Sequence, residues 1–205
     1  MTHPLIQSIR SRRTTQLFDA ARPIDDTQIE ELVGIATTAP TSFNLQNWRF
    51  IAVRTQAEKE RLRALAWDQV KVTESAVTFI VCGQLADASV MAARLAPSVA
   101  QGFMPAEMVS GWEGAARSLY ADQPQRQRDE AVRSATFGAG TLIQAAHALG
   151  LGAAPMIGFD AEAVADAFEL AADEVPVLLL AVGHPAPGNW PQKPRRPLAE
   201  VLTLR

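Results

Sequence analysis

Two long hydrophobic segments place the strongest constraint on the fold of this chain. Residues 76–82 (AVTFIVC) and 175–182 (VPVLLLAV) are almost continuously apolar. A strand with this pattern is buried on both faces, so it requires helices packed above and below the sheet. Residues 48–53 (WRFIAV) predict a further strand. Because Pro176 has no N–H to donate, we expect the first one or two residues of its segment to lie outside the sheet.

Helical patterns alternate with these strands. Thr27 with Glu30, and Thr55 with Glu58, form capping-box patterns that predict helix starts. Residues 135–149 are almost entirely small or apolar, so their helix should lie in a core or at a subunit interface. The predicted helices cover residues 4–13, with Leu5, Ile6 and Ile9 as a buried stripe, and residues 27–38, 55–66, 126–149 and 160–168.

Together these elements predict one layered domain over residues 1–205, with a sheet flanked by helices, either α/β or α+β. The chain is 48% hydrophobic, which is enough for a core, and no Gly/Ser-rich linker divides it. Residues 86–134 contain helical patches, but prolines and glycines interrupt them, so the sequence does not predict where helices begin and end there.

Composition argues against several classes of function. The net charge of -3 disfavours general nucleic-acid binding, which needs a basic face. Cys82 is the single cysteine, and the three histidines lack HExxH spacing, so we expect neither a disulfide nor a metal site. No apolar run reaches the roughly 18–20 residues of a membrane span, and the N-terminus lacks signal-peptide order. We therefore expect a cytoplasmic protein without a membrane or nucleic-acid partner.

Three polar segments are candidates for binding. Residues 12–18 (RRTTQLF) are either a solvated helix end or an anion site, since arginine forks and hydroxyls suit a phosphate monoester. Residues 39–48 (APTSFNLQNW) are either an ordinary connection or a loop that recognises the polar edge of a heterocycle, with Trp48 as a packing anchor. Residues 193–198 (KPRRPL) form a weaker basic motif. Glycine-rich nucleotide motifs and the serine-hydrolase elbow are absent.

The order of these segments resembles the nitroreductase family of flavoproteins. RRTTQLF is similar to that family's RRSxRxF, and APTSFNLQNWRFIAV to its APSxxNxQPWxFIVV. AWDQVKVTESAVTFIVC, LGLGAAPMIGF, a VGHP strand end and a terminal KxRR follow in the family's order. The resemblance covers residues 4–83 and 135–205 and leaves 86–134 unmatched. It implies an α+β fold, a three-layer α/β/α sandwich around a mixed, mostly antiparallel sheet.

The resemblance also implies a homodimer that binds FMN at the subunit interface. Arg12 and Thr14 would hold the phosphate and ribityl chain, joined by Lys193 and either Arg195 or Arg196. Residues 40–44 would reach the flavin across the interface, the segment around residue 68 would face the pyrimidine edge, and residues 155–158 would cover the other side. The implied FMN-binding residues are Arg12, Arg13, Thr14, Gln16, Pro40, Thr41, Ser42, Asn44, Asp68, Lys71, Pro155, Met156, Ile157, Gly158, Lys193, Arg195 and Arg196.

The activity that the resemblance implies is ping-pong hydride transfer from NAD(P)H through flavin N5 to a nitroaromatic, quinone or similar acceptor, with no catalytic side chain. Residues 86–134 would form a variable helical lid, and 184–205 an extension packed on the partner subunit. Phe103, Met104, Trp112 and Tyr120 are lid candidates, although core packing is the simpler interpretation of each. The alternatives are a reductase of small aldehydes or enones, a flavin carrier or sensor without turnover, and a binder of another phosphate ligand.

Three residues depart from the family's pattern. Gln16 stands where Arg or Lys is frequent, Asp68 where Asn is usual, and Asn47 where Pro is usual. Reduced flavin carries negative charge near N1 and O2, so fewer nearby cations lower its redox potential. With Lys71 as the main local cation, we predict a lower potential than in relatives with Lys or Arg at position 16.

Overall fold

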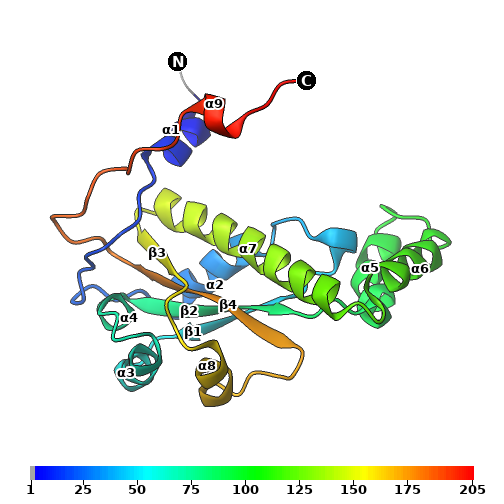
Figure 1. The fold of residues 1–205 in the computed structure, drawn as a ribbon, viewed down its shortest axis with the longest axis horizontal. Coiled ribbons are helices and arrows are strands. Elements are labelled where there is room, and N and C mark those ends of the chain that lie inside the picture. The colour runs from blue at the N-terminus through cyan, green and yellow to red at the C-terminus, as the bar shows by residue number, and fades with distance from the viewer. Residues whose placement is uncertain (1–2) are drawn as a thin grey trace.

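The computed structural model describes residues 3–205 and has three layers (Figure 1). A four-stranded sheet lies between two layers of helices. The strands are β1 (Trp48–Val53), β2 (Val77–Gln84), β3 (Gly152–Met156) and β4 (Glu174–Gly183). The helices are α1 (Pro4–Ser11), α2 (Asp26–Ala36), α3 (Gln56–Leu65), α4 (Lys71–Glu74), α5 (Met91–Ala100), α6 (Met108–Tyr120), α7 (Pro124–Ala148), α8 (Ala161–Ala167) and α9 (Leu198–Val201), with short 3-10 turns η1 (Ser42–Asn44) and η2 (Ala88–Val90).

The sheet order is β1-β2-β4-β3, and each neighbouring pair is antiparallel. The expected α+β fold class is therefore confirmed. Among the described residues the parallel pairing is confined to an isolated bridge between Thr14 and Ala153, which brings the N-terminal segment onto the edge strand β3. The sequence pattern did not predict β3 as a strand.

Both faces of the two central strands are buried, as their apolar sequences predict. On one face Phe79 and Leu180 pack in a core with α2 and α7. On the other face Ile80 and Leu179 pack in a core that includes Leu62 of α3. The small residues of α7 lie in the first of these cores, so that helix packs on the sheet of the same chain.

The close approach of α7 to β2 depends on Gly83. A Cβ added at this position would lie 2.2 Å from the carbonyl oxygen of Ala131. Because that neighbour is backbone, it cannot rotate away, and we expect Gly83→Ala to cost about 1–3 kcal/mol. At about 2–4 °C per kcal/mol for a chain of this size, the melting temperature should fall by roughly 2–12 °C. Gly114→Ala in α6, with nothing within 4 Å of its Cβ, is the matched control. Equal melting temperatures for both variants would contradict this account.

Several local predictions were wrong in detail. The capping box of α2 is formed by Asp25 and Gln28, two residues before the predicted pair. Pro176 lies within β4 and pairs with Cys82, next to a shift in register that leaves Val177 of β4 without a partner in β2.

The predicted caps at Thr55 and Asp160 are confirmed, since each side chain accepts a backbone N–H of its helix.

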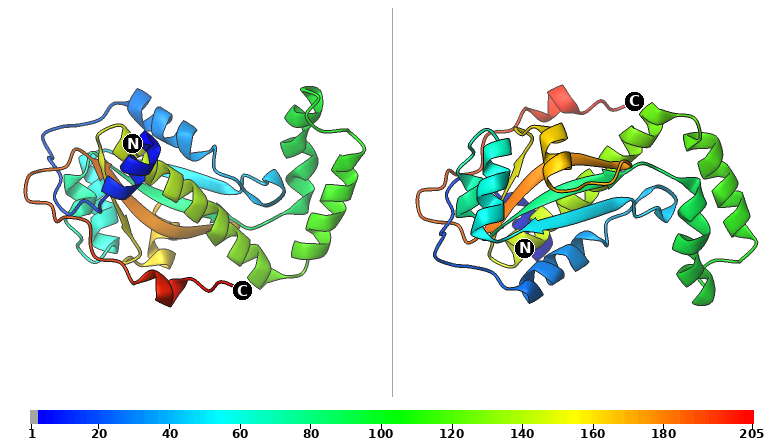
Figure 2. Two further views of the ribbon diagram at one scale, coloured as in Figure 1. Left: turned by 90° about the horizontal axis from the view of Figure 1, so that it is seen from above. Right: turned by 90° about the horizontal axis from the view of Figure 1, so that it is seen from below.

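Helices α5 and α6 project from one end of the sheet as a separate hairpin (Figure 2). They have their own apolar core, which includes Leu45 from the loop before β1. Met104 and Tyr120 are buried in or against this core, whereas Phe103 is 79% exposed and Trp112 is 37% exposed. Core packing, the simpler interpretation of these side chains, therefore holds for Met104 and Tyr120 and fails for Phe103.

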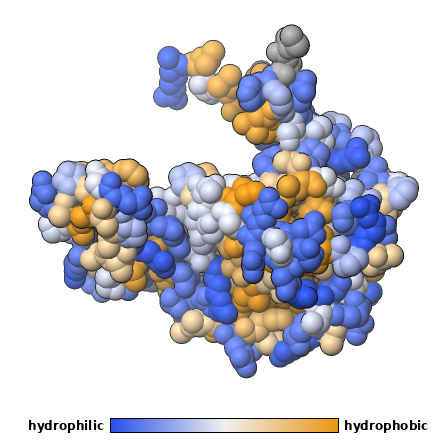
Figure 3. Space-filling view, turned by 180° about the vertical axis from the view of Figure 1, so that it is seen from behind, coloured by the Kyte–Doolittle hydropathy of each residue, from blue (hydrophilic) through white to orange (hydrophobic). Residues whose placement is uncertain are grey.

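The chain carries exposed apolar residues near both ends. The stripe predicted to be buried on α1 is exposed, because α1 projects beyond α7 and touches it only at one end. The tail after β4 runs to the same side of the molecule, and Figure 3 shows hydrophobic side chains on this projecting part. The exposed apolar residues of the two segments are Leu5, Ile6, Ile9, Leu198, Val201, Leu202 and Leu204.

Within residues 3–205, no helix is both long and apolar enough to cross a bilayer. The same residues contain no group of three or more His, Cys, Asp or Glu side chains placed to hold a metal ion.

Candidate functional site

The tail and the N-terminal segment are joined by Asn189. Its side-chain oxygen accepts the N–H groups of Gln16 at 2.6 Å and Leu17 at 3.0 Å. Its side-chain nitrogen donates to the carbonyl oxygens of Leu17 and Ala186, both at 2.8 Å. Three of these four hydrogen bonds join the tail to Gln16 and Leu17, which lie 172 or 173 positions earlier in the sequence, and the fourth, to Ala186, lies within the tail.

This clamp creates a basic hollow lined by Thr14, Gln16, Trp190, Pro191, Gln192, Lys193 and Arg195. The sequence predicted four of these residues as FMN ligands, and the structure brings them together. None of the lining residues carries a carboxylate. At about 40 Å³ the hollow has room for a small anionic group and not for a whole nucleotide, whose pockets measure roughly 300–1,000 Å³.

Lys71 lies next to Gln16, one of the residues that line the basic hollow. Its ammonium lies 3.5 Å from the side-chain oxygen of Gln16. Burial and the charge of Lys193 lower the pKa of Lys71, because both disfavour a second positive charge there. An anion bound beside these two lysines would reverse the repulsion, so the donor set fits a phosphate or a reduced flavin ring.

The structure separates the two candidate arginines of the tail. Arg195 lines the basic hollow. When the side-chain amide of Gln192 is turned so that its oxygen faces Arg195, that oxygen accepts from Arg195 at 3.0 Å, and the amide nitrogen donates to the carbonyl oxygen of Arg12 at 3.0 Å. Arg196 instead forms an ion pair with Glu200 at 3.3 Å. Its charge is already matched by that carboxylate, so Arg195 is the better placed of the two.

Arg12 and Arg13 line a second, adjacent hollow rather than the basic one. This hollow also contains Ser11 and His147, whose side chains form a hydrogen bond of 2.9 Å. The backbone of Arg12 is tied to the tail through Gln192, but its guanidinium is not among the groups that line the basic hollow. The predicted role of Arg12 as a phosphate ligand is therefore less directly supported than that of Arg195.

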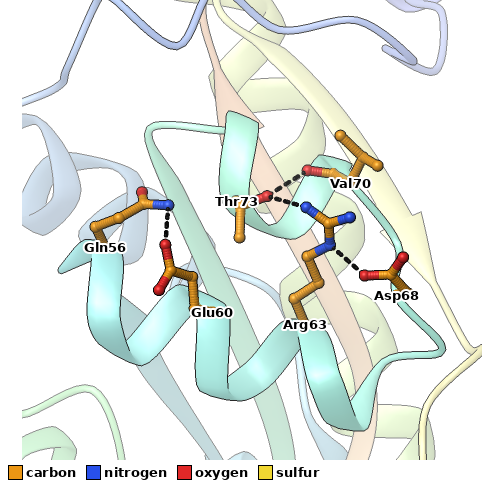
Figure 4. A network of polar contacts seen from close by, with 6 residues as sticks. All are labelled: Gln56, Glu60, Arg63, Asp68, Val70 and Thr73. Carbon is orange, nitrogen blue, oxygen red and sulfur yellow. Dashed lines mark hydrogen bonds and ion pairs between the residues drawn. The ribbon is translucent and has the colours of Figure 1, made fainter.

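Asp68 is held by an arginine that the sequence did not single out (Figure 4). Arg63 donates from Nε to Asp68 at 2.7 Å and from its terminal nitrogen to the hydroxyl of Thr73 at 3.2 Å. Asp68 has a φ of +56°, so this turn needs such support. The guanidinium of Arg63 therefore partly offsets the charge of the Asp68 carboxylate.

Residues 155–158 lie beside this turn. A Cβ at Gly158 would lie 2.8 Å from the ring of Trp67, and Gln69 donates to the carbonyl oxygen of Gly158 at 2.7 Å. Ile157 is 83% exposed and available for contact. The side chain of Met156 is buried in the core on the α3 side, so only its backbone can face a ligand.

Residues 40–44 lie at the opposite end of the sheet. They precede Trp48, which pairs with Gly83, whereas Thr14 bridges to β3 near the end where Val77 pairs with β4. The two ends are separated by the length of β2, which is roughly 25 Å for its eight residues. One protomer therefore does not bring residues 40–44 to its own basic hollow.

Asn47 has a structural explanation. Its side chain is buried and donates to the carbonyl oxygen of Gln84 at 2.8 Å, while the N–H of Gln84 donates to the carbonyl oxygen of Asn47 at 2.9 Å. Proline at position 47 could not donate through a side chain. This departure from the family's pattern closes the end of the β1-β2 pair through the side-chain nitrogen, while the side-chain oxygen is buried without a hydrogen-bond partner.

Sequence reasoning missed Asn189, Trp190, Gln192 and Arg63. The ammonium nitrogen of Lys193 lies over the ring of Trp190, 5.6 Å from the ring centroid. The signal that could have pointed to Trp190 is an exposed tryptophan in a proline-rich tail, next to a basic motif. No local pattern marks an asparagine whose partners lie far away in the sequence.

Comparison with known proteins shows one family and several relatives that this chain resembles over most of its length. The sequence pattern of the Nitroreductase family matches residues 9–184. Protein DrgA of Synechocystis sp. is 34% identical over 204 residues, covering 96% of this chain and 94% of DrgA. An NADH dehydrogenase of Thermus thermophilus is 30% identical over 183 residues, covering 89% and 87% of the two chains. A crystal structure from Exiguobacterium sibiricum in complex with FMN superposes with a TM-score of 0.90 at 25% identity, covering 100% of this chain and 99% of that one.

Proposed function

This chain belongs to the nitroreductase family and is an FMN-dependent NAD(P)H oxidoreductase, and we propose that its acceptor is a nitroaromatic, a quinone or a similar small electron-poor molecule. We propose that NAD(P)H and the acceptor use the same face in turn, in a ping-pong sequence. The observation that carries the proposal is the basic hollow, where Thr14, Lys193 and Arg195 are gathered without a neighbouring carboxylate.

The residues present fit FMN. Arg195 and Lys193 would hold the phosphate, with Thr14 donating from its hydroxyl. Lys71 and Gln16 lie deeper and would face the pyrimidine edge. Bound FMN accepts and donates hydride at N5, and the backbone N–H groups near residues 157–158 would offer a donor at that position. The protein's contribution is to bind, orient and supply charge.

We propose that each FMN is shared by two protomers. Residues 40–44 and the basic hollow lie at opposite ends of β2, whose eight residues span roughly 25 Å, so a second copy would have to bring its loop to that hollow. The exposed apolar residues of α1 and the tail supply a surface for such an interface. In this proposal residues 184–205 pack on the partner, and the projecting helices of residues 86–134 form a lid within a single domain of residues 1–205.

A substitution at Gln16 tests whether charge at this position changes the redox potential of the flavin. Gln16→Lys adds a cation beside Lys71, so it should stabilise reduced flavin and raise the midpoint potential. An added charge is worth roughly 1 kcal/mol, or about 20 mV for a two-electron couple. Anaerobic potentiometric titration measures this shift. An unchanged or lower midpoint would show that position 16 does not face the charged part of the ring.

The proposed activity is tested by mixing the FMN-loaded protein anaerobically with NADH or NADPH. Loss of the oxidised-flavin absorbance near ~450 nm within seconds is expected. Recovery of that absorbance on adding nitrofurazone or a quinone would support the proposed acceptor class. Recovery only with a short semialdehyde or enone would favour the alternative reductase, and FMN binding without bleaching would favour a carrier or sensor.

The cytoplasmic location, and the expectation of no nucleic-acid partner, stay predictions from composition.

A further inference from the structure

The loop that would reach the partner's flavin has a strained backbone. Phe43, Asn44 and Gln46 have φ values of 52°, 55° and 48°, in the left-handed region that side chains other than glycine rarely adopt. Hydrogen bonds within the loop support this shape: the hydroxyl of Thr41 accepts the N–H of Gln46 at 2.9 Å, and the carbonyl oxygen of Thr41 accepts the N–H of Asn44 at 3.1 Å. Strained conformations persist only where neighbouring structure determines them, so further contacts must hold the loop.

Helix α6 supplies those contacts. The ring of Phe43 packs edge-on against Trp112 at 6.2 Å and against Tyr120 at 6.3 Å between centroids. Tyr120 is 3% exposed, and its hydroxyl donates to the hydroxyl oxygen of Ser42 at 2.9 Å. The last residue of the projecting hairpin is thus bonded to the centre of the loop.

The surroundings of Tyr120 keep it a donor. The pKa of Tyr120 is raised above its usual value, because burial and both the charge of Glu130 and a hydrogen bond with it outweigh the lowering by Ser42 and Arg133. Glu130 is itself buried and paired with Arg133, which lines the same hollow as residues 40–42. The phenol therefore stays protonated at neutral pH. When it donates to Ser42, the hydroxyl hydrogen of Ser42 is free to point elsewhere.

We propose that Tyr120 is a positioning residue for the cofactor: its hydroxyl fixes Ser42, and with it residues 41–44, in the conformation that contacts FMN bound to the partner. The projecting hairpin is then part of the cofactor site and not only a cover for the substrate. This inference rests on the proposed function, in which residues 40–44 contact FMN across the dimer.

The test is a double-mutant cycle on FMN binding. Tyr120→Phe keeps the ring and its edge contacts and removes only the hydroxyl, and Ser42→Ala removes the same hydrogen bond from the other side. Each single variant should raise the FMN dissociation rate and Kd about 5- to 10-fold, and the double variant no more than Ser42→Ala alone. Ser110→Ala, which removes an exposed hydrogen bond within α6, is the control and should bind FMN like the unaltered protein.

A role limited to fold stability would move different quantities. In that case Tyr120→Phe lowers the melting temperature of the apoprotein and leaves FMN dissociation unchanged, which overturns the proposal. Additive effects of the two variants also overturn it, because they show that Tyr120 does not act through Ser42. If neither variant alters FMN binding while Arg195→Ala does, the cofactor assignment stands and the role of Tyr120 fails. If the unaltered protein binds no FMN, the proposed function fails first.

Discussion

Replacing Arg195 with alanine is expected to weaken FMN binding by roughly 10- to 100-fold, whereas Arg196→Ala leaves it unchanged. A charge-assisted hydrogen bond to phosphate contributes about 1.5–3 kcal/mol, and each 1.4 kcal/mol is a factor of ten in Kd. Arg195 lines the basic hollow, while Arg196 is paired with Glu200 at 3.3 Å. Two adjacent arginines of equal charge thus provide a matched pair.

Titration of apoprotein with FMN, followed by quenching of flavin fluorescence, measures both constants. Repetition at higher ionic strength should reduce the difference between the unaltered protein and Arg195→Ala, since exposed ion pairs are screened by salt. Equal losses in both variants would show that the tail acts through general charge. A loss confined to Arg196→Ala would place the tail in another register on the ligand.

Asn189→Ala is expected to weaken FMN binding about 10-fold or more, although Asn189 itself need not touch the ligand. The substitution removes three hydrogen bonds that hold the tail to residues 16 and 17, and a fourth, to Ala186, that orders the tail itself. At about 0.5–1.5 kcal/mol each, their loss should release Lys193 and Arg195 from the N-terminal segment. The cost then appears as the entropy of ordering the tail when the phosphate binds.

Asn189→Asp is the matched comparison. The carboxylate keeps both acceptor bonds to the N–H groups of Gln16 and Leu17 and loses both donor bonds. Its affinity for FMN should fall between those of Asn189→Ala and the unaltered protein. Limited proteolysis should cut the tail faster in Asn189→Ala than in either. Unchanged FMN affinity and proteolysis in Asn189→Ala would refute the clamp.

The central sheet could be predicted because its constraint is local. An unbroken run such as residues 76–82 can be satisfied only between two helical layers, and the register of alternating side chains follows from it. Helix starts were less certain, because Asp25 and Thr27 are both good caps and tertiary packing decides between them. The strand β3 was missed because its five residues, with glycine and proline among them, carry no strand signal.

The candidate site was predictable as a set of segments and not as a geometry. Position in sequence could not separate Arg195 from Arg196, since a shift of one residue changes which side chain faces the basic hollow. Asn189 and Arg63 act through partners that only the fold brings near. The apolar stripe on α1 is exposed in the single chain. Helical periodicity predicted that this face is covered, but periodicity does not identify what covers it.

The central claim is that each FMN is bound by the basic hollow of one protomer and residues 40–44 of another. It is tested by co-expressing Arg195→Ala subunits with Ser42→Ala/Asn44→Ala subunits, each of which should bind FMN poorly as a homodimer, and purifying the mixed dimer with two affinity tags. The account predicts one tightly bound FMN per mixed dimer, because one of its two cofactor sites combines an intact hollow with an intact loop. A mixed dimer that binds no FMN tightly would contradict it, since both sites would then be built within single chains.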